Sequence, residues 1–592
     1  MTNKIKYMAV ALALGLTSCN DWLDPNEYAL KQRDQIYEVT YRLQAMASGI
    51  YGSIPHQTDL GMSAATDEGE LVDNTASLQQ FNGGNWNKYN NTDNVWSKCY
   101  TGIRIAMDVL EESSKQTWSE WQYSNPTRYV ELIRDLNTVR AEARFLSAYL
   151  YFELFKRYGD VPLITEKLDI NIDMDYTQYQ RRPVSEIIDY ISEQCDIVCR
   201  EGKWYMSEEE MAAQTDNGKH LLPIPYRDTL ATAYPLSGEL SSYLGRATKA
   251  SAYALKAKAL VYFASKTFNP ENDIERWKNA AAACYKVLNL PKSSYALETN
   301  YADLFQKKAN WSKEFLFVRK AGASNSFEKA NYPVSIEGGS TGMCPSQNLV
   351  DAYEVVTYDE NGVAVSARKF DWNNEVDKNA PFANRDPRMY ATVYTHGEQY
   401  NSTVNTIVLD CSEGGNSGLP IYHATKTGYY LKKYISPGLD LKNNKTDPKT
   451  WILMRLADFY LYYAEAMNEA YGPNDPADYG MTALEALNTV RRRAGMPDAT
   501  AKNQDEMREI IYHERQVELA FENQRWWDVR RWQYGQAFNQ ELRGFKITKD
   551  GTKETYEPIA VEERVFDESK MYLYPIPQSE IDKGHLEQNV NW

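Results

Sequence analysis

Residues 507–532 have the sequence MREIIYHERQVELAFENQRWWDVRRW. The apolar residues of this stretch recur at the spacing of one helix face that is turned toward a core, at Ile510, Val517, Ala520 and Phe521. Glu514 lies on this face where a hydrophobic residue is expected, and a carboxylate held against a core must be paired or strongly hydrogen-bonded. We therefore expect a helix that carries charge into the core, with the other helices of the chain packed against it.

Cations that could pair with this carboxylate are close in the sequence: Arg515, Arg525, Arg530 and Arg531. Two acid–base pairs are spaced so that they can meet on a helix surface: Glu522–Arg525 and Asp528–Arg531. Such a cluster of charge and tryptophan is compatible with an active site, where perturbed ionisable groups gather. We favour the alternative, a buried structural clamp in which each charge is held by a partner.

The 592-residue chain has a net charge of −16, and aromatic residues make up 13% of it. An acidic surface repels phosphate backbones, so nucleic acid is not expected as a partner. Seven cysteines are present, without the spacing of a disulfide or zinc framework. Cys195 and Cys199 lie one helical turn apart and could form a metal pair, but we favour two small buried residues. No metal and no cofactor are expected.

The first nineteen residues resemble the leader of a bacterial lipoprotein. Lys4 and Lys6 precede an apolar run, residues 8–16, that is too short to span a bilayer. The run ends in Leu-Thr-Ser-Cys, which resembles a lipobox with Cys19 as the acylated residue. We expect residues 1–18 to be a signal peptide, and several acyl chains on Cys19 to anchor the chain in outer-membrane lipid. An ordinary secretory signal with an incidental cysteine is the alternative.

Two further features bear on the membrane. Asp21 and Asp24 follow the expected lipid closely, and this acidic start resembles the surface-export signals of some Gram-negative lipoproteins. No later segment approaches 18 consecutive apolar residues, so nothing else is expected to enter the bilayer. The sequence thus predicts a lipid-anchored protein exposed on the cell surface.

Helical periodicity recurs along most of the chain. Apolar residues three and four positions apart predict helices over residues 34–51, 96–110, 129–158, 183–199, 244–264, 274–288, 451–471 and 484–494. The alanines on one face of residues 247–264 let a neighbouring helix approach closely. Two helices and a short turn within about forty residues form the repeating unit of an α-solenoid.

Three stretches lack this periodicity: residues 52–95, 201–243 and 291–450. They are rich in residues that favour turns, so we interpret them as irregular insertions. The last insertion contains short runs that favour strands, at residues 314–319, 391–395 and 406–409. We therefore expect loops and small hairpins there.

Several passages together resemble the SusD/RagB family of outer-membrane nutrient-uptake lipoproteins. They are residues 16–19 with 22–24, 140–163, 247–264, 452–469, 486–495, 514–532, 572–580 and 588–592. The resemblance implies a mostly α fold: one domain, residues 19–592, with a helical scaffold of four tetratricopeptide-like helix pairs and variable loops that build the ligand site. It also implies a non-catalytic role, in which the protein captures oligosaccharides, or sometimes peptides, above a TonB-dependent transporter of the SusC type.

Candidate ligand-binding residues come from the aperiodic stretches, because aromatic rings in the regular helices are expected in the core. Exposed aromatic rings stack on the flat C–H faces of sugars, and neighbouring polar groups bond the hydroxyls. The family often places an aromatic binding residue where the loop around Trp86 lies. The candidates are Trp86, Tyr89, Asn85 and Asp67 in the first insertion, and Trp311 and Tyr332 in the third. Each has a core position as the alternative.

The leading hypothesis is a glycan-binding lipoprotein that serves an outer-membrane importer. One alternative is a peptide-binding member of the same family. A surface glycoside hydrolase is the less favoured alternative, because it needs two facing carboxylates, which a sequence with 81 acidic residues neither reveals nor excludes.

Overall fold

The computed structural model describes residues 40–55, 60–116, 118–169, 175, 178–216, 219–220, 224–232, 244–306, 311–401 and 406–592. The expected signal peptide, Cys19 and the beginning of the helix expected over residues 34–51 lie outside these ranges. The first helix described is α4 (Thr40–Gly52).

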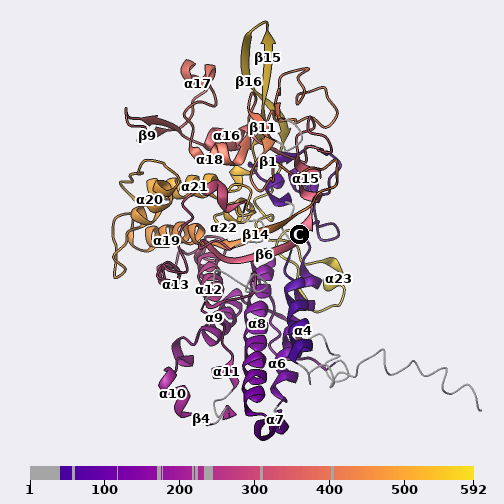
Figure 1. The fold of residues 1–592 in the computed structure, drawn as a ribbon, viewed down its shortest axis with the longest axis vertical. Helices are drawn as coiled ribbons and strands as arrows, with labels where there is room; N and C mark the ends of the chain where they lie inside the picture. The colour runs from indigo at the N-terminus through magenta and orange to yellow at the C-terminus, as the bar shows by residue number, and fades with distance from the viewer. Residues whose placement is uncertain are drawn as a thin grey trace, which may run out of the picture.

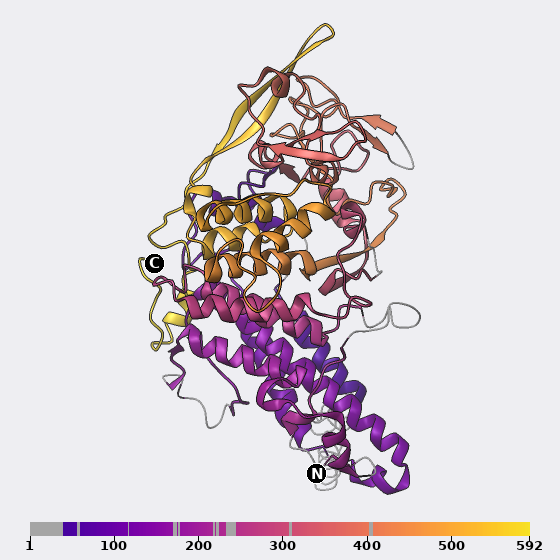
Figure 2. The same cartoon turned by 90° about the vertical axis from the view of Figure 1, so that its left-hand side faces the viewer.

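Long helices packed in chain order form the scaffold of the molecule (Figures 1 and 2). The indigo and magenta helices occupy one end of the molecule, and the orange helices of the C-terminal half stack on them (Figure 2). Eight of them provide the four helix pairs that the family resemblance implies: α6 (Trp96–Ser114), α8 (Pro126–Tyr158), α9 (Val184–Cys199), α12 (Lys249–Ala264), α13 (Ile274–Leu288), α19 (Leu456–Tyr471), α20 (Ala483–Arg493) and α21 (Gln504–Glu518). The expectation of a mostly helical fold is confirmed.

Local sequence explains where these helices begin and end. The Asn125 side chain accepts a hydrogen bond from the Arg128 amide, which caps α8, and Gly159, with φ of 72°, ends it. Thr248 and Ser251 form a capping box at the start of α12. The alanines of α12 are buried against its neighbours, as expected from their spacing.

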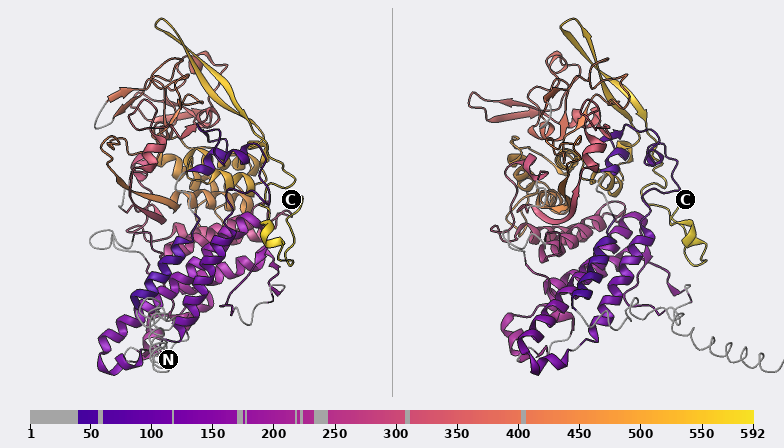
Figure 3. Two further views of the ribbon diagram at one scale, coloured as in Figure 1. Left: turned by 90° about the vertical axis from the view of Figure 1, so that its right-hand side faces the viewer. Right: turned by 45° about the vertical axis from the view of Figure 1, so that its right-hand side comes forward.

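A second region of loops, short helices and two-stranded sheets covers one end of the stack (Figure 3). Its sheets are β1 (Gly69–Leu71) with β7 (Met343–Pro345), β8 (Val355–Tyr358) with β9 (Ala364–Arg368), β10 (Val393–Tyr394) with β13 (Tyr430–Leu431), and β11 (Gln399–Asn401) with β12 (Thr406–Val408). Its short helices include α5 (Gln79–Asn82), α14 (Tyr301–Leu304), α15 (Ser326–Asn331), α16 (Gln347–Ala352), α17 (Glu375–Asn379) and α18 (Pro387–Thr392). Most of this region falls in the insertion predicted over residues 291–450, and it has a hydrophobic core of its own.

A long antiparallel ribbon links this region to the stack. It pairs β6 (Phe315–Ser324) with β14 (Asp447–Arg455), so that Trp451 lies opposite Arg319. The helix predicted over residues 451–471 is therefore wrong in its first five residues, because α19 begins only at Leu456. Burial of Trp451 and Ile452 against the second core favours the strand over local helical periodicity.

The longest hairpin, β15 (Glu541–Asp550) with β16 (Lys553–Glu563), projects from the end of the molecule (Figures 1 and 2). No prediction covered this segment. Elsewhere on the stack, β2 (Val161–Pro162) pairs with β3 (Arg181–Arg182), and β4 (Thr215–Asp216) pairs with β5 (Lys219–His220). The remaining short helices are α7 (Ser119–Ser124), α10 (Glu208–Ala213), α11 (Ile224–Arg227), α22 (Arg525–Arg531) and α23 (Gln578–Ile581).

The stretch at residues 507–532 forms two helices rather than one. Helix α21 ends at Glu518, and the chain turns through Phe521 and Asn523, whose φ angles are 58° and 56°, before α22 begins. Phe521 is fully buried, so its burial follows from this turn and not from a continuous helix face. The expectation of a buried clamp is nevertheless confirmed, because the charged residues from Glu514 to Arg531 lie in the core and all of them except Arg530 form ion pairs.

The partners of these charges differ in part from those expected. Glu514 pairs with Arg388 and Arg491 rather than with the neighbouring arginines. Glu522 pairs with Arg455 and Lys433 instead of Arg525, which binds Asp67. The expected pair Asp528–Arg531 is present, with 2.9 Å between its closest atoms. The partners supplied by distant segments could not be read from local spacing.

Arg455 is the centre of this buried network at the junction of the two regions. It is 1% exposed and lies 2.7 Å from Glu314, 2.7 Å from Glu518 and 2.6 Å from Glu522. Each carboxylate is thus held by charge-assisted bonds, and the arginines beside Glu518 keep the pKa of that residue below its usual range despite burial. Removing one partner from such a network leaves a buried charge unpaired, at a cost of about 3–5 kcal/mol.

Candidate functional site

Trp86 lies in the core, contrary to the expectation that its aperiodic loop keeps it outside. Its side chain is 2% exposed, and its ring centroid lies 5.1 Å from that of Phe81, 5.1 Å from that of Tyr574 and 4.6 Å from that of Trp592. The loop therefore packs against the C-terminal segment through this ring. No face of the indole is open to a ligand, so Trp86 is not part of the candidate site.

The same cluster surrounds a buried arginine. The guanidinium carbon of Arg530 lies 4.9 Å from the ring of Trp526, 4.7 Å from that of Tyr574 and 5.7 Å from that of Trp86. None of its three nitrogen atoms has a hydrogen-bond partner among the described residues. Burial lowers its pKa to about 10, and cation–π contacts are the interactions that hold its charge.

Two further candidates from the sequence are buried as well. Asp67 is 4% exposed, and both of its oxygens accept hydrogen bonds from Arg525, at 2.9 Å each. Tyr332 is fully buried, and its hydroxyl bonds the Ser436 carbonyl and the Leu439 amide. Both residues hold elements of the protein together and offer no surface to a ligand.

The remaining candidates reach the surface but do not form one site. Tyr89 is 76% exposed, Asn85 is exposed, and their loop contacts the C-terminal segment through the bond between the Gln578 amide and the Lys88 carbonyl. Trp311 is half-buried, with its ring against Phe315. Binding of a ligand by Asn85, Tyr89 or Trp311 remains a prediction.

The most exposed aromatic side chain on the second region is Tyr422, in the loop between β12 and β13. It is 82% exposed, and its ring stacks on the imidazole of His423, with 4.0 Å between centroids and 23° between planes. One ring face is therefore supported from below while the other is presented to solvent. A ring held in this way loses little conformational freedom when a flat ligand stacks on it.

A second loop, residues 71–75, lies close to His423 and Lys426 in the Tyr422 loop. Lys426 donates hydrogen bonds to the Leu71 carbonyl, at 2.8 Å, and to the Asn74 side chain, which joins the two loops. Two hydrogen bonds from Thr75 lower the pKa of Asp73, and the charges of His423 and Lys426 lower it further. We call the surface formed by Tyr422, His423, Lys426, Asp73 and Asn74 the Tyr422 surface.

A pair of carboxylates lies beneath this surface. Glu70 is 3.9 Å from Lys426 and 2.8 Å from Arg564, and Asn82 donates a 3.2 Å bond to Glu562. Burial, together with a hydrogen bond and repulsion from Glu70, raises the pKa of Glu562 to about 7. Glu70 is 2% exposed, so the space between these carboxylates is closed to a sugar ring.

The sequence contained a signal for the Tyr422 surface. Tyr422 follows Gly-Leu-Pro-Ile, residues 418–421, in an aperiodic part of the third insertion. This is the same criterion that selected Trp86. The sequence does not show that Trp86, and not Tyr422, packs against aromatic rings from the C-terminal end of the chain.

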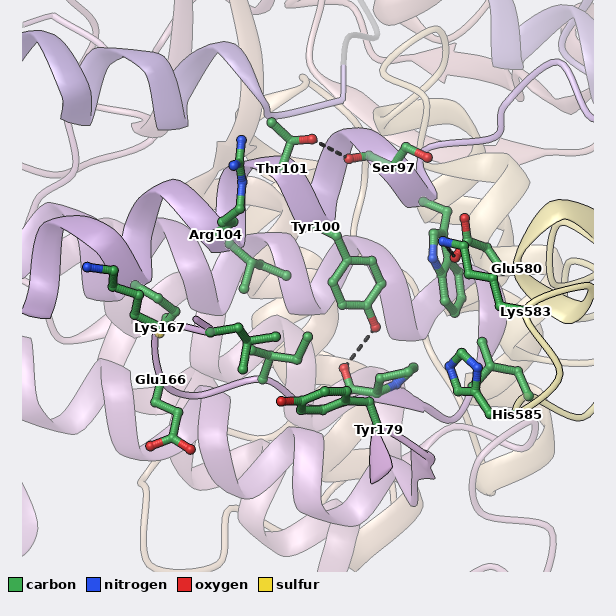
Figure 4. Close-up of a pocket in the computed structure, with 17 residues that line it drawn as sticks. Ser97, Tyr100, Thr101, Arg104, Glu166, Lys167, Tyr179, Glu580, Lys583 and His585 are labelled. Atoms are coloured by element: carbon green, nitrogen blue, oxygen red, sulfur yellow. Dashed lines mark hydrogen bonds and ion pairs between the residues drawn. The ribbon is translucent and has the colours of Figure 1, made fainter. Parts of the chain in front are cut away.

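Among the residues that the structure describes, three open hollows of about 420–480 Å³ lie away from this surface. One, of about 480 Å³, lies between α14 and α18 and is lined by Phe305, Tyr390 and Tyr394. Two of its three rings are largely covered, since Phe305 is 6% exposed, Tyr394 is 4% exposed and the Lys432 ammonium lies 4.8 Å over the Tyr394 ring, whereas Tyr390 is 40% exposed. A second, of about 420 Å³, lies between α4 and β6. The third, of about 470 Å³, lies along α6 and is shown in Figure 4.

Within the described ranges, no group of three or more His, Cys, Asp or Glu side chains is arranged to hold a metal ion. The six cysteines described are buried and form no disulfide bond with one another. Cys195 and Cys199 lie on the buried face of α9, as expected. Among the helices that the structure describes, none combines the length and the apolar character needed to cross a bilayer.

Comparisons with known proteins agree with this architecture. The family model described as "SusD family" matches residues 311–592, and one described as "Starch-binding associating with outer membrane" matches residues 21–197. SusD-like protein P2 of Formosa agariphila is 24% identical over 98% of this chain and 97% of its own length. A SusD-like protein of Bacteroides ovatus is 24% identical over 78% of this chain and 70% of its own length.

Solved structures share the fold. A SusD-like protein from Bacteroides fragilis, 23% identical, superposes with a TM-score of 0.72 and covers 96% of this chain and 100% of that one. A laminarin-binding SusD-like protein, 18% identical, superposes with a TM-score of 0.57 over 93% of this chain and 99% of that one. At these identities the structures bear on the fold alone. The two family models, which together match residues 21–197 and 311–592, identify the chain as a member of the SusD/RagB family.

Proposed function

We propose that this protein binds oligosaccharide and polysaccharide nutrients at the cell surface without cleaving them, and delivers them to a SusC-like, TonB-dependent transporter in the outer membrane. The observation that carries the proposal is the Tyr422 surface, where an exposed aromatic ring stacked on His423 belongs to the same pair of joined loops as the polar groups of Lys426, Asp73 and Asn74. Sugars are recognised by this combination of a flat apolar face and convergent polar groups.

Family membership supports the choice of ligand. One matching family model is described as starch-binding, and one neighbouring structure is described as laminarin-binding. Both polymers are neutral glucans, and their C–H faces suit a tyrosine platform. A chain with a net charge of −16 also disfavours strongly anionic ligands unless a local basic patch compensates.

The anchoring part of the proposal comes from the sequence. Acylation of Cys19 would hold the domain on the outer membrane, and the family model that matches residues 21–197 is described as associating with that membrane. In this arrangement the transporter and TonB supply the energy for import. The lipoprotein only captures the glycan and releases it, so it must bind the glycan reversibly.

One residue, Glu562, has a property that a glycoside hydrolase would need. Glu562 has a raised pKa, as a general acid requires, and a carboxylate neighbour in Glu70. The two share Asn82 and Arg564 as hydrogen-bond partners, which leaves no room between them for a glycosidic bond. This geometry favours binding over cleavage.

One experiment separates the three possibilities. The purified protein is run through native gels that contain individual polysaccharides, and the same mixtures are assayed for new reducing ends. Retarded migration without new reducing ends supports the proposal. Release of sugar that is lost in Glu562→Gln would establish the hydrolase, and binding to a peptide mixture but to no glycan would establish a peptide-binding member of the family.

The delivery step needs a separate test. The protein is isolated with its acyl anchor from outer membranes in mild detergent, and the proteins that co-purify are identified. We expect a TonB-dependent transporter in about equal amount. Isolation of the lipoprotein alone under conditions that keep other membrane complexes intact would contradict this part of the proposal.

A further inference from the structure

The groove along α6 is built from three segments that are far apart in the sequence (Figure 4). Helix α6 supplies one wall, residues 162–168 with Tyr179 supply the second, and residues 580–586 near the C-terminus close one end. We call this the α6 groove. Its volume of about 470 Å³ lies in the range of small-molecule sites, roughly 300–1,000 Å³, and it shares no residue with the Tyr422 surface.

An aromatic side chain stands at the centre of the groove. The Tyr100 hydroxyl donates a 2.8 Å hydrogen bond to the Pro162 carbonyl, which fixes the orientation of the ring (Figure 4). Burial raises the pKa of Tyr100 well above its ordinary value, so the hydroxyl stays neutral at physiological pH. Tyr179 adds a second ring to the lining.

Both lysines of the groove are paired with carboxylates. Lys583 pairs with Glu580 at 2.6 Å, and Lys167 pairs with Glu112 on α6. Exposed hydroxyls on Ser97 and Thr101 line the same wall (Figure 4). Arg104 and Glu166 also line the groove, at exposed positions where water can still reach their charges. A lining of rings, hydroxyls, paired charges and solvated rim charges suits a neutral ligand rich in hydroxyl groups, because no buried isolated charge has to be desolvated when it binds.

One polar atom of the lining lacks a partner. The Nδ1 atom of His585 is buried and has no hydrogen-bond partner among the described residues. A buried polar atom without a partner costs about 1–3 kcal/mol, which a hydroxyl group from a ligand would recover. His585 lies close to the Tyr179 end of the groove (Figure 4).

We propose that the α6 groove is a second carbohydrate-binding site, which takes a short neutral oligosaccharide. The proposal rests on the proposed glycan-binding function but concerns a different surface of the protein. A peptide fits this groove less well, because extended peptides add to a strand edge through main-chain hydrogen bonds. The edge that borders the groove ends in Pro162, which has no N–H group and whose carbonyl already binds Tyr100.

The test uses variants that separate the two surfaces. Thr101→Trp fills the α6 groove from an exposed helical position, and Tyr422→Ala removes the ring of the Tyr422 surface. Thr489→Trp is the matched control, because Thr489 on α20, like Thr101, bonds the carbonyl four residues earlier and lies outside the groove. Neutral oligosaccharides, including those from starch and laminarin, are titrated calorimetrically into each full-length protein, and circular dichroism checks the fold.

We expect Tyr422→Ala to retain some oligosaccharide binding. Adding Thr101→Trp to Tyr422→Ala should weaken this remaining binding at least tenfold, whereas adding Thr489→Trp should leave it unchanged. His585→Phe keeps the ring but removes its nitrogen atoms, and should weaken groove binding about fivefold, the equivalent of one hydrogen bond.

Loss of all glycan binding in Tyr422→Ala, with Thr101→Trp unchanged, would overturn the second site and leave the proposed function standing. Failure of every oligosaccharide to bind the wild-type protein would overturn both. A third outcome is that the protein binds a peptide but no oligosaccharide, and that Thr101→Trp abolishes the peptide binding. This result would assign the groove to peptides and overturn the proposal.

Discussion

Replacing Trp86 by alanine tests whether this ring belongs to the core or to a ligand site. The side chain is 2% exposed and contacts three aromatic rings from distant parts of the chain. Truncating a buried tryptophan to alanine costs about 3–5 kcal/mol, because the protein loses both the transfer free energy of the ring and its packing. The cavity would also expose the unpaired guanidinium of Arg530 to a partly hydrated space.

Urea denaturation followed by far-UV circular dichroism measures this loss, with Tyr89→Ala as the control from the same loop. Because Tyr89 is 76% exposed, its replacement should change the free energy of unfolding by less than about 0.5 kcal/mol. We expect folded Trp86→Ala protein to bind glycan with unchanged affinity. A variant as stable as the wild type but with weakened glycan binding would refute the core assignment and restore Trp86 as a ligand contact.

The remaining predictions concern buried charge and the anchor. Arg455→Met should lower the free energy of unfolding by about 3–5 kcal/mol, because it leaves three buried carboxylates without their shared cation. Arg530→Met should lower it by less than about 1 kcal/mol, or raise it, because Arg530 has no hydrogen-bond partner among the described residues. Equal losses for the two variants in urea denaturation would contradict this account. Burial raises the pKa of Glu68 to about 8, so its contribution to stability is complete below pH 4.5 and is lost as the pH rises through 8. Stability should therefore fall between about pH 4.5 and pH 8, by up to about 1.4 kcal/mol per pH unit relative to Glu68→Gln, and level off above pH 8; parallel pH profiles would rule the shift out. Cys19→Ala should abolish acylation, detected by mass spectrometry of the N-terminal peptide; an acylated variant would disprove Cys19 as the lipid site.

The helical stack could be predicted because its signal is local. The period of apolar residues in α8, and the cap and glycine that bound it, lie within the helix and its immediate flanks. The same holds for the alanine face of α12. Boundaries predicted in this way agree with the structure to within a few residues in most of the long helices.

Pairing between distant segments could not be predicted in the same way. Residues 451–455 continue a helical pattern in the sequence, yet they form a strand because β6 supplies a partner from more than a hundred residues earlier. Glu514 likewise signalled a buried carboxylate correctly, but its cations come from α18 and α20. Local sequence shows that a partner is needed and does not show which one is used.

The candidate site shows the same limit. Trp86 and Tyr422 both lie in aperiodic stretches, and local sequence does not distinguish them. The difference is made by Tyr574 and Trp592, which bury the first ring, and by His423, which supports the second from one side only. Exposure of an aromatic ring in a loop is therefore a property of the tertiary structure.

The central claim is that an exposed ring in the variable region, not the helical scaffold, makes the principal contact with a glycan. The most direct measurement compares Tyr422→Ala with Tyr123→Ala, whose ring is 79% exposed on α7, in native gels that contain the polysaccharide bound by the wild type. The account predicts that Tyr123→Ala migrates like the wild type, and that Tyr422→Ala shows an affinity lower by about tenfold, or roughly 1.4 kcal/mol. Equal retardation of Tyr422→Ala and the wild type would contradict it.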